Sequence, residues 1–217
     1  MSNCCSPGSY REIFGEKQAR RDAGRYRRKG LDPTAELMVD RLGDVHGATV
    51  LEVGGGVGAI GLELLKRGAR HSTNVELSPA YDTEAKALAR EAGVDERVER
   101  RVGDFTRDGV PPADVVEMHR VVCCYPDYET LLGAASDHAG SALVFSFPRE
   151  KWWWRVAVWA LNLLQRLRRR SFRAYVHPVA ALLEVPPRHG LALDFEHEGR
   201  VWRMAGFRRC ATDVSST

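Results

Sequence analysis

Short apolar runs alternate with amphipathic stretches along most of this chain. Five runs of four to seven residues have the pattern of buried strands, and stretches with helical spacing of apolar residues follow most of them. Two further runs, 192–198 and 201–208, lie close together and favour an antiparallel hairpin. Alternating strands and helices predict an α/β fold with a parallel sheet and crossover connections. The five expected strands are 49–53, 73–76, 98–102, 113–118 and 141–147.

The expected helices begin and end at recognisable residues. Asp32 followed by Pro33 indicates a helix start, with the aspartate as N-cap and the proline in the first turn. Residues 10–29 predict a basic helical lead-in, so we divide the chain into a lead-in or lid, 1–30, and a main domain, 31–217. Further helices are expected over 59–68, 78–93, 128–138 and 151–170 and from about residue 178, so every expected strand except 98–102 and 113–118 leads directly into one.

The glycine-rich turn after the first strand is the most informative segment. Residues 50–58 have the sequence Val-Leu-Glu-Val-Gly-Gly-Gly-Val-Gly and lead into a helical pattern. A strand, a glycine turn and a helix N-terminus form a nucleotide-type cofactor site, because the ligand approaches bare backbone and free N–H groups. Two templates fit this turn. One is the dinucleotide fingerprint Gly-x-Gly-x-x-Gly/Ala, and the other is acid-x-Gly-x-Gly-x-Gly, met by Glu52, Gly54, Gly56 and Gly58.

An acid at the end of the second strand supports a cofactor with a ribose. Glu76 lies about twenty residues beyond the glycine turn, where a carboxylate accepts hydrogen bonds from both ribose hydroxyls. This role suits a nicotinamide cofactor as well, so Glu76 alone does not decide between the two templates.

The second template and the order of the segments after it resemble the class I S-adenosylmethionine (SAM)-dependent methyltransferases, over roughly residues 30–209. The resemblance implies a Rossmann-like, seven-stranded, mostly parallel sheet with an antiparallel C-terminal hairpin and helices on both faces. It implies SAM as cofactor, with Asp104 binding the adenine amino group and Phe105 covering the adenine ring. The implied cofactor contacts are Glu52, Gly54, Gly56, Gly58, Glu76, Asp104, Phe105 and His119.

His119 follows the fourth strand directly, where the resemblance places a residue close to the sulfonium and the incoming substrate. A neutral imidazole there can take a proton from a hydroxyl, amine or thiol, so His119 is the candidate catalytic residue. Simple packing against the cofactor is the alternative, because positioning alone can supply most of the acceleration of a methyl transfer. Arg120 and Tyr125 are candidate substrate contacts; Arg120 would bind a carboxylate or, alternatively, form a surface ion pair.

The loop after the fourth strand also carries the adjacent pair Cys123-Cys124. These thiols, together with Cys4-Cys5, suggest capture of a soft metalloid for methylation. The alternative is that they are small buried apolar residues.

Segment 151–170 contains four of the five tryptophans and ends in a basic run. The resemblance implies a cap over a hydrophobic substrate pocket, with Trp153 as a substrate contact. A packed surface helix and a membrane-interface helix are the alternatives. A second basic run, 20–29, raises nucleic acid as a partner. However, residues 118–121 lack the Asn/Asp-Pro-Pro-aromatic pattern of base-methylating relatives, so we favour a solvated face or contact with the cofactor carboxylate.

Composition limits the remaining possibilities. The chain has 217 residues, 44% of them hydrophobic, which suits one globular core. No run of 18 apolar residues predicts a membrane span. The start, 1–6, has no apolar signal segment, and the five cysteines are an odd number, so we expect reduced thiols and a cytoplasmic protein. No C-x-x-C spacing suggests a metal site, and the net charge of +3 says little about partners.

A narrower resemblance links the basic lead-in and residues 145–149 to the magnesium-protoporphyrin O-methyltransferases. Residues 119–125 depart from the pattern of that family, so the acceptor stays open. We predict a SAM-dependent methyltransferase for a small, hydrophobic or aromatic molecule with an O, N or S acceptor atom. The alternatives are an NAD(P)-dependent oxidoreductase, a thiol or metalloid methyltransferase using Cys123-Cys124, and a non-catalytic membrane- or nucleic-acid-binding module.

Overall fold

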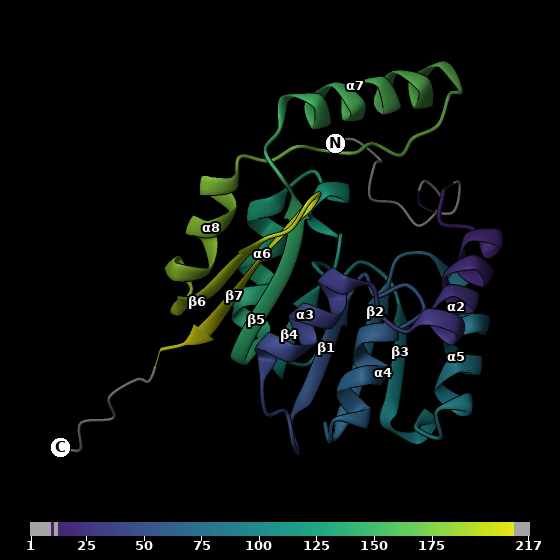
Figure 1. Cartoon of the computed structure of the whole chain (residues 1–217), viewed down its shortest axis with the longest axis vertical. Helices are drawn as coiled ribbons and strands as arrows, with labels where there is room; N and C mark the ends of the chain where they lie inside the picture. The colour runs from purple at the N-terminus through teal and green to yellow at the C-terminus, as the bar shows by residue number, and fades with distance from the viewer. Residues whose placement is uncertain (1–9, 11–12, 211–217) are drawn as a thin grey trace.

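A seven-stranded sheet forms the centre of the molecule in this computed structural model (Figure 1), which describes residue 10 and residues 13–210. The strands are β1 (Thr49–Val53), β2 (His71–Glu76), β3 (Val98–Val102), β4 (Ala113–Met118), β5 (Ala139–Pro148), β6 (Leu191–Glu198) and β7 (Trp202–Arg209). Their order is β3-β2-β1-β4-β5-β7-β6. Strands β1 to β5 are parallel, and β7 runs antiparallel to both β5 and β6. The predicted fold is confirmed.

Helices cover both faces of the sheet (Figure 1). On one face lie α3 (Pro33–Leu42), α4 (Ala59–Lys66) and α5 (Asp82–Glu91), with α2 (Glu16–Lys29) packed against α5. On the other face lie α6 (Tyr128–His138) and α8 (Val179–Arg188). Each face has its own apolar cluster, because the central parallel strands are buried on both sides. Single helical turns complete the chain: η2 (Pro79–Tyr81), η3 (Asp95–Arg97) and η4 (Val122–Cys124).

Local signals explain most of the boundaries. The carboxylate of Asp32 accepts hydrogen bonds from the N–H groups of Thr34 and Ala35, at 3.1 and 3.3 Å, so the predicted N-cap of α3 is confirmed. The helix expected over 78–93 is divided into η2 and α5.

The tryptophan-rich helix, α7 (Trp152–Leu167), follows the carboxyl end of β5 and lies above the sheet and the helices that cover it (Figure 1). A strap, residues 168–178, returns from it to α8. The Asn162 side chain ties helix and strap together, because it donates to the Ala174 carbonyl at 2.8 Å and accepts its N–H at 2.9 Å. No helix in the described part of the chain is long and apolar enough to cross a membrane.

Candidate active site

A cavity of about 720 Å³ lies at the carboxyl edge of the sheet, beside the ends of β1, β2 and β4. The strand order reverses direction between β1 and β4, which is where open α/β sheets bind their ligands. The volume of the cavity is within the range of small-molecule sites. The glycine turn, the basic side of α2, the segment after β3 and the loop after β4 line it. The Cys4-Cys5 pair lies outside the described residues.

The glycine turn exposes bare backbone to the cavity. Gly54 and Gly56 line it, with φ values of +65° and +56°. A Cβ on Gly54 would lie 2.7 Å from the Val121 side chain, so the turn and the loop after β4 approach too closely for a larger residue. Gly58 begins α4 with φ +80° and faces Asn74 rather than the cavity. Gly58 therefore shapes the turn.

Glu76 joins the end of β2 to the glycine turn. Its carboxylate accepts the N–H of Gly56 at 3.0 Å and that of Ser78 at 2.8 Å, and it also lines the cavity. Burial raises the pKa of this carboxyl, although the two N–H donors act in the opposite direction. A carboxylate has acceptor capacity for about four hydrogen bonds, so capacity remains for a ligand.

Asp104 and Phe105 reach the same cavity from the segment after β3. The Asp104 Oδ1 accepts the N–H and the hydroxyl of Thr106, at 3.1 and 2.9 Å. The hydroxyl of Tyr125, a predicted substrate contact, lies 3.4 and 3.5 Å from the two Asp104 oxygens. The ring of Phe105 packs edge-on against His138, with the centroids 5.1 Å apart. Two predicted cofactor residues and one predicted substrate residue thus lie together.

Glu52 reaches the cavity from beneath the glycine turn. It is only 2% exposed and accepts a hydrogen bond from the Asn74 amide at 3.0 Å. Glu117, its neighbour in register on β4, shares a hydrogen bond with it. Burial raises the pKa of Glu52 to about 7 and that of Glu117 well above its usual range, where the charge of Glu52 raises it further. Glu117 therefore keeps its proton and donates it to Glu52.

His119 lines the cavity with both ring nitrogens engaged. The Ser146 hydroxyl accepts the backbone N–H of Arg120 at 2.9 Å and lies 2.9 Å from His119 Nδ1. Its own proton therefore points to Nδ1, and this pattern assigns the ring proton to Nε2. Nε2 lies 3.0 Å from the Oδ2 of Asp32. Burial lowers the pKa of His119, against the opposing effect of Asp32, so the ring is neutral. It has no free lone pair to take a proton from an acceptor.

Asp32 connects α3 to this loop. Besides capping α3 and bonding His119, it lies 3.2 Å from the Nη2 of Arg120. Burial would raise the pKa of its carboxyl, but His119 and Arg120 hold that pKa well below its usual range. Arg120 has φ +62°, and its guanidinium carbon lies 4.9 Å from the centre of the Trp202 ring. Arg120 forms an ion pair, which was one alternative for it, and its side chain also lines the cavity.

The cysteine pair sits on a loop that is held from two sides. The Sγ atoms of Cys123 and Cys124 lie 3.8 Å apart, and Cys124 lines the cavity. The Tyr10 hydroxyl donates to the Cys124 carbonyl at 2.6 Å, and the Tyr175 N–H of the strap donates to the Cys123 carbonyl at 2.8 Å. Within residues 10 and 13–210, no three His, Cys, Asp or Glu side chains are grouped so that they would hold a metal ion.

One part of the cavity wall is cationic. Arg21, Arg25, Arg28 and Lys29 line it from α2, and none of the four forms an ion pair with another described residue. Arg25 lies close enough to His119 for its charge to lower the pKa of that ring. Together with Arg120, these side chains make this part of the wall locally positive, whereas the carboxylates of Asp22, Asp32, Glu52, Glu76 and Asp104 also line the cavity.

Helix α7, expected as a cap, contributes no side chain to the cavity lining. Trp153 does not line the cavity; it is 41% exposed and packs against its neighbour Trp154. The strap after α7 contacts residues of the cavity wall instead: Phe172 packs edge-on against the rings of Tyr10 and Phe14, which line the cavity, with both centroid distances at 5.6 Å. The helical pattern located α7, but it did not show that its side chains lie outside the cavity lining.

Several site residues were missed by sequence reasoning. Asp32 was interpreted only as a helix cap, yet α3 precedes β1 and so must begin at the carboxyl edge, which was an available signal. Ser146 lies inside an apolar strand, and Trp202 lies on the last strand. No local pattern marks either of them, since their partners come from distant parts of the chain.

Membership of a family follows from comparison with known proteins. The family of O-methyltransferase domains matches residues 25–133, just over half of the chain. The chain therefore belongs to the O-methyltransferase domain family, and it is a SAM-dependent methyltransferase. The alternative of an NAD(P)-dependent oxidoreductase was wrong, and the acid-x-Gly-x-Gly-x-Gly template is the one that applies. No curated protein matches the chain in sequence.

Solved structures share most of the fold of this chain. Magnesium protoporphyrin IX methyltransferase from Synechocystis PCC 6803, with bound S-adenosylhomocysteine (SAH), is 20% identical over 94% of this chain and 93% of that chain, with a TM-score of 0.68. An O-methyltransferase family 2 protein from Planctomyces limnophilus DSM 3776, in complex with apigenin, is 17% identical over 90% of this chain and 62% of that chain, with a TM-score of 0.68. Geranyl diphosphate C-methyltransferase from Streptomyces coelicolor A3(2) is 14% identical over 82% of this chain and 77% of that chain, with a TM-score of 0.64.

Proposed function

We propose that this methyltransferase transfers the methyl group of SAM to an oxygen of a small, hydrophobic or aromatic acceptor that carries a negative charge. The observation that carries this proposal is the group of four unpaired cations on α2 in a cavity that also has aromatic walls. SAM brings only one carboxylate, which neutralises one of them. The remaining positive charge favours an anionic acceptor.

The chain's own residues fit the cofactor. Gly54 and Gly56 offer bare backbone where a Cβ would crowd the facing side chains. We infer that Glu76 holds the ribose hydroxyls, that Asp104 accepts from the adenine amino group and that Phe105 covers the adenine ring. Glu52 and Gly58 keep the turn in shape from below. When bound, SAM supplies an electrophilic methyl group on a positively charged sulfur.

The engaged histidine also supports an anionic acceptor. Because both nitrogens of His119 are already bonded, the site holds no free imidazole to remove a proton. A carboxylate or an acidic phenol is already ionised at neutral pH and needs no base. We infer that Arg120 binds this anion, that the α2 cations bind the cofactor carboxylate, and that His119 is a positioning residue for Arg120.

Aromatic side chains would hold the body of the acceptor. Tyr10, Phe14 and Tyr125 line the cavity and present flat apolar surface. The apigenin complex and the magnesium protoporphyrin IX methyltransferase among the structural neighbours support a small-molecule acceptor.

A second candidate is a thiol or metalloid acceptor. It is favoured by Cys124, which lines the cavity with its sulfur 3.8 Å from that of Cys123. Methylation of arsenite by the wild type, lost in Cys124→Ser, would support this alternative.

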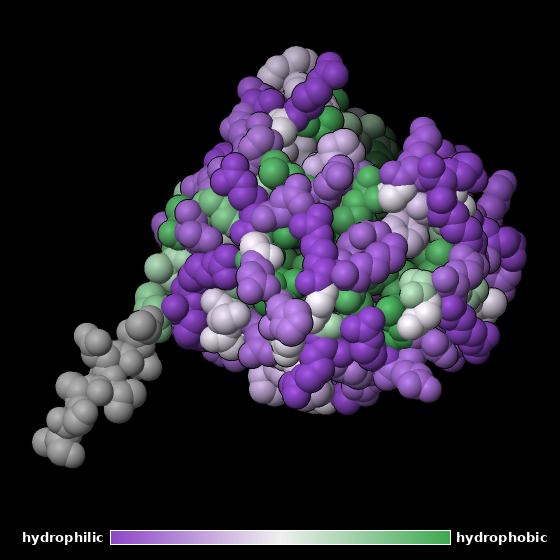
Figure 2. All heavy atoms as spheres, turned by 60° about the horizontal axis from the view of Figure 1, so that its bottom comes forward, coloured by the Kyte–Doolittle hydropathy of each residue, from purple (hydrophilic) through white to green (hydrophobic). Residues whose placement is uncertain are grey.

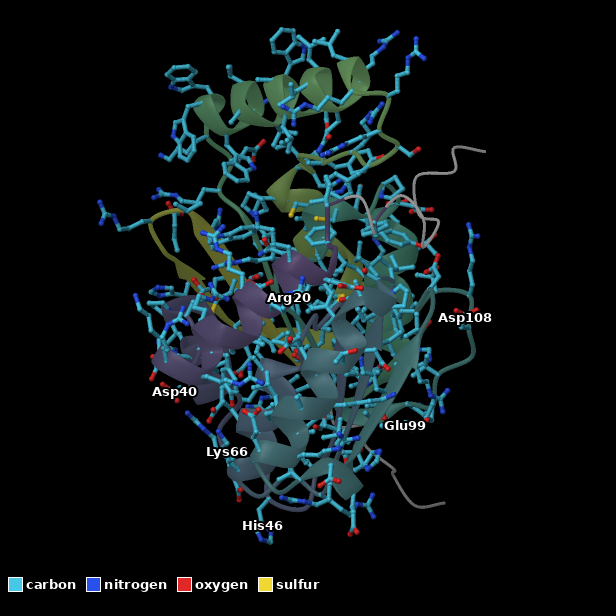
Figure 3. The ribbon with its side chains drawn as sticks, turned by 90° about the vertical axis from the view of Figure 1, so that its right-hand side faces the viewer. Arg20, Asp40, His46, Lys66, Glu99 and Asp108 are labelled. Atoms are coloured by element: carbon cyan, nitrogen blue, oxygen red, sulfur yellow. The ribbon has the colours of Figure 1, made fainter. Side chains whose placement is uncertain are left out.

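The cofactor assignment is tested by isothermal titration with SAH. We expect micromolar binding by the wild type and a loss of about tenfold or more in Glu76→Ala and in Asp104→Ala, because each removes a hydrogen-bonding carboxylate from the cavity. Glu99→Ala is the matched control, since Glu99 is an exposed acid on β3 outside the cavity (Figure 3). Unchanged affinity in both site variants would contradict these roles.

The acceptor class is tested with tritiated SAM and acceptors that share one ring system. We expect methyl incorporation into naphthoate, which carries its charge on oxygen at neutral pH, and much less into naphthol, naphthylamine or naphthalenethiol. Arg120→Ala should raise the KM for the acceptor while leaving SAH affinity within about twofold. Methylation of naphthol, the amine or the thiol in preference to naphthoate would overturn the proposed class.

A further inference from the structure

The apolar side of α7 faces away from the protein. Along this side, large apolar residues recur at spacings of three or four: Trp152, Val156, Trp159, Leu163 and Leu167. Trp152 is 77% exposed, Trp159 is 66% and Leu167 is 73%. The side chains that α7 does bury, Val158 and Gln165, lie on the opposite side of the helix. This is the reverse of an ordinary surface helix, which turns its apolar side to the core. We call these five residues the outer stripe.

The charge around the outer stripe has a single sign. Segment 151–173 contains no Asp or Glu, and its seven basic residues are Lys151, Arg155, Arg166, Arg168, Arg169, Arg170 and Arg173. Most of them follow the last turn of α7, so a cationic segment borders one end of the apolar one.

No described segment covers the outer stripe. Side chains of α7, indole rings among them, project outward at the top of the molecule in Figure 3. The opposite end, turned forward in Figure 2, is covered mainly by hydrophilic side chains. A contiguous apolar surface on a water-facing helix, such as the outer stripe, marks a site of interaction.

We propose that α7 is a docking helix that lies in the interface of an anionic lipid bilayer. The outer stripe would enter the boundary of the acyl chains, where tryptophan is favoured, and the basic residues would contact anionic headgroups. Each basic residue near such a surface adds to the electrostatic attraction.

Charge decides between a bilayer and a second copy of this chain. Pairing two outer stripes would bring two segments of seven cations together with no acid within 151–173 to offset them. An anionic bilayer offers apolar depth and negative charge at once.

The position of α7 fits this role. The helix leaves the carboxyl end of β5, the same edge at which the cavity lies, and the strap links it to the loop of Cys123 and to Tyr10. A docked molecule would therefore turn its cavity edge toward the bilayer.

Vesicle flotation tests the apolar contribution. We expect the wild type to float with vesicles of phosphatidylcholine and phosphatidylglycerol. Trp152→Ser/Trp159→Ser should lower the partition coefficient by about tenfold or more. The matched control is Val102→Ser/Leu193→Ser, which changes two apolar residues that are each 47% exposed elsewhere. Unchanged SAH binding shows that each variant is folded.

The charge contribution needs a second pair of variants. Arg168→Gln/Arg169→Gln/Arg170→Gln should lose binding to anionic vesicles, whereas Arg20→Gln/Arg90→Gln/Arg188→Gln, with the same change in net charge, should keep it. Arg20 lies on α2, away from α7 (Figure 3). High salt should also weaken the binding of the wild type to anionic vesicles.

Three results would overturn the proposal. One is the absence of wild-type flotation with anionic vesicles, and another is equal flotation of the tryptophan variant. The third is a lipid-free dimer in sedimentation that dissociates in Trp152→Ser/Trp159→Ser, which would assign the outer stripe to a second copy of the chain.

Discussion

The hydrogen bonds of His119 restrict what this residue can do. One ring nitrogen is bonded to Ser146 and the other to Asp32, which also holds Arg120. An imidazole held in this way sets the position of the arginine beside it. General-base catalysis would require one of these bonds to break first.

A pH profile separates the two roles of His119. We expect His119→Gln to lower kcat by less than about a hundredfold and to leave the shape of the pH profile unchanged, because no proton passes through the ring. The measurement uses whichever acceptor the naphthalene series identifies. Loss of an ionisation below about pH 6.5 from the wild-type profile on this substitution would show that His119 is the base after all.

The buried carboxyl pair makes folding sensitive to pH. Both carboxyls have a folded-state pKa above the usual 4.5, about 7 for Glu52. The folded state therefore binds more protons than the unfolded state. The contribution of this pair to stability is fully present below the unfolded-state pKa and is lost as the pH rises through the folded-state pKa. Glu117→Gln keeps a donor to Glu52 without a titrating proton. At about pH 8 we expect the free energy of unfolding of this variant to exceed that of the wild type by roughly 1–3 kcal/mol. At about pH 4 we expect little difference.

Thermal unfolding across this pH range checks the expectation. Glu99→Gln, on an exposed acid, serves as the control and should follow the wild type throughout. A Glu117→Gln curve parallel to the wild-type curve would show that the pair does not share a proton.

At the scale of elements, α2 belongs to the cofactor site. Its basic side lines the cavity, while its small residues Ala19 and Ala23 are completely buried against the main body. A lead-in that packs in this way is a wall of the site as well as a connecting segment.

The charge of α2 gives a salt-dependent prediction. Arg25→Ala should weaken SAH binding about five- to tenfold at low salt, because it removes a cation from the cavity, and the difference should shrink at high salt. Arg20→Ala is the control, since Arg20 pairs with Glu16 and lies outside the cavity. Titration at two ionic strengths decides; equal weakening in both variants would point to a loss of helix stability instead.

The sequence predicted elements better than their orientation. The Asp32 cap, the glycine turn and the bounds of α6 could be recognised because their signals are local. The pattern of α7 showed which side is apolar, but not whether that side faces the core. That outcome depends on the strap and on Asn162, whose partner lies 12 residues away.

On the scale of the whole molecule, the order of segments was enough to predict the sheet, because crossover connections leave few topologies. The site was predictable only in part. Its cofactor side comes from strand ends, which the order locates. Its other side depends on contacts between distant residues, such as Tyr10 with Cys124, 114 positions apart, and Asp32 with His119, 87 apart. Nothing in either local sequence specifies the partner.

The place of β7 in the sheet has a consequence for the protein as it is synthesised. This strand is made last, yet it lies between β5 and β6 and pairs with both. A chain still attached to the ribosome can assemble five parallel strands, but the outer edge of β5 stays bare until residues 202–209 emerge. Phe145, which later stacks on Phe207, also lacks that partner until then. The nascent chain is therefore most prone to aggregation between the emergence of these two strands.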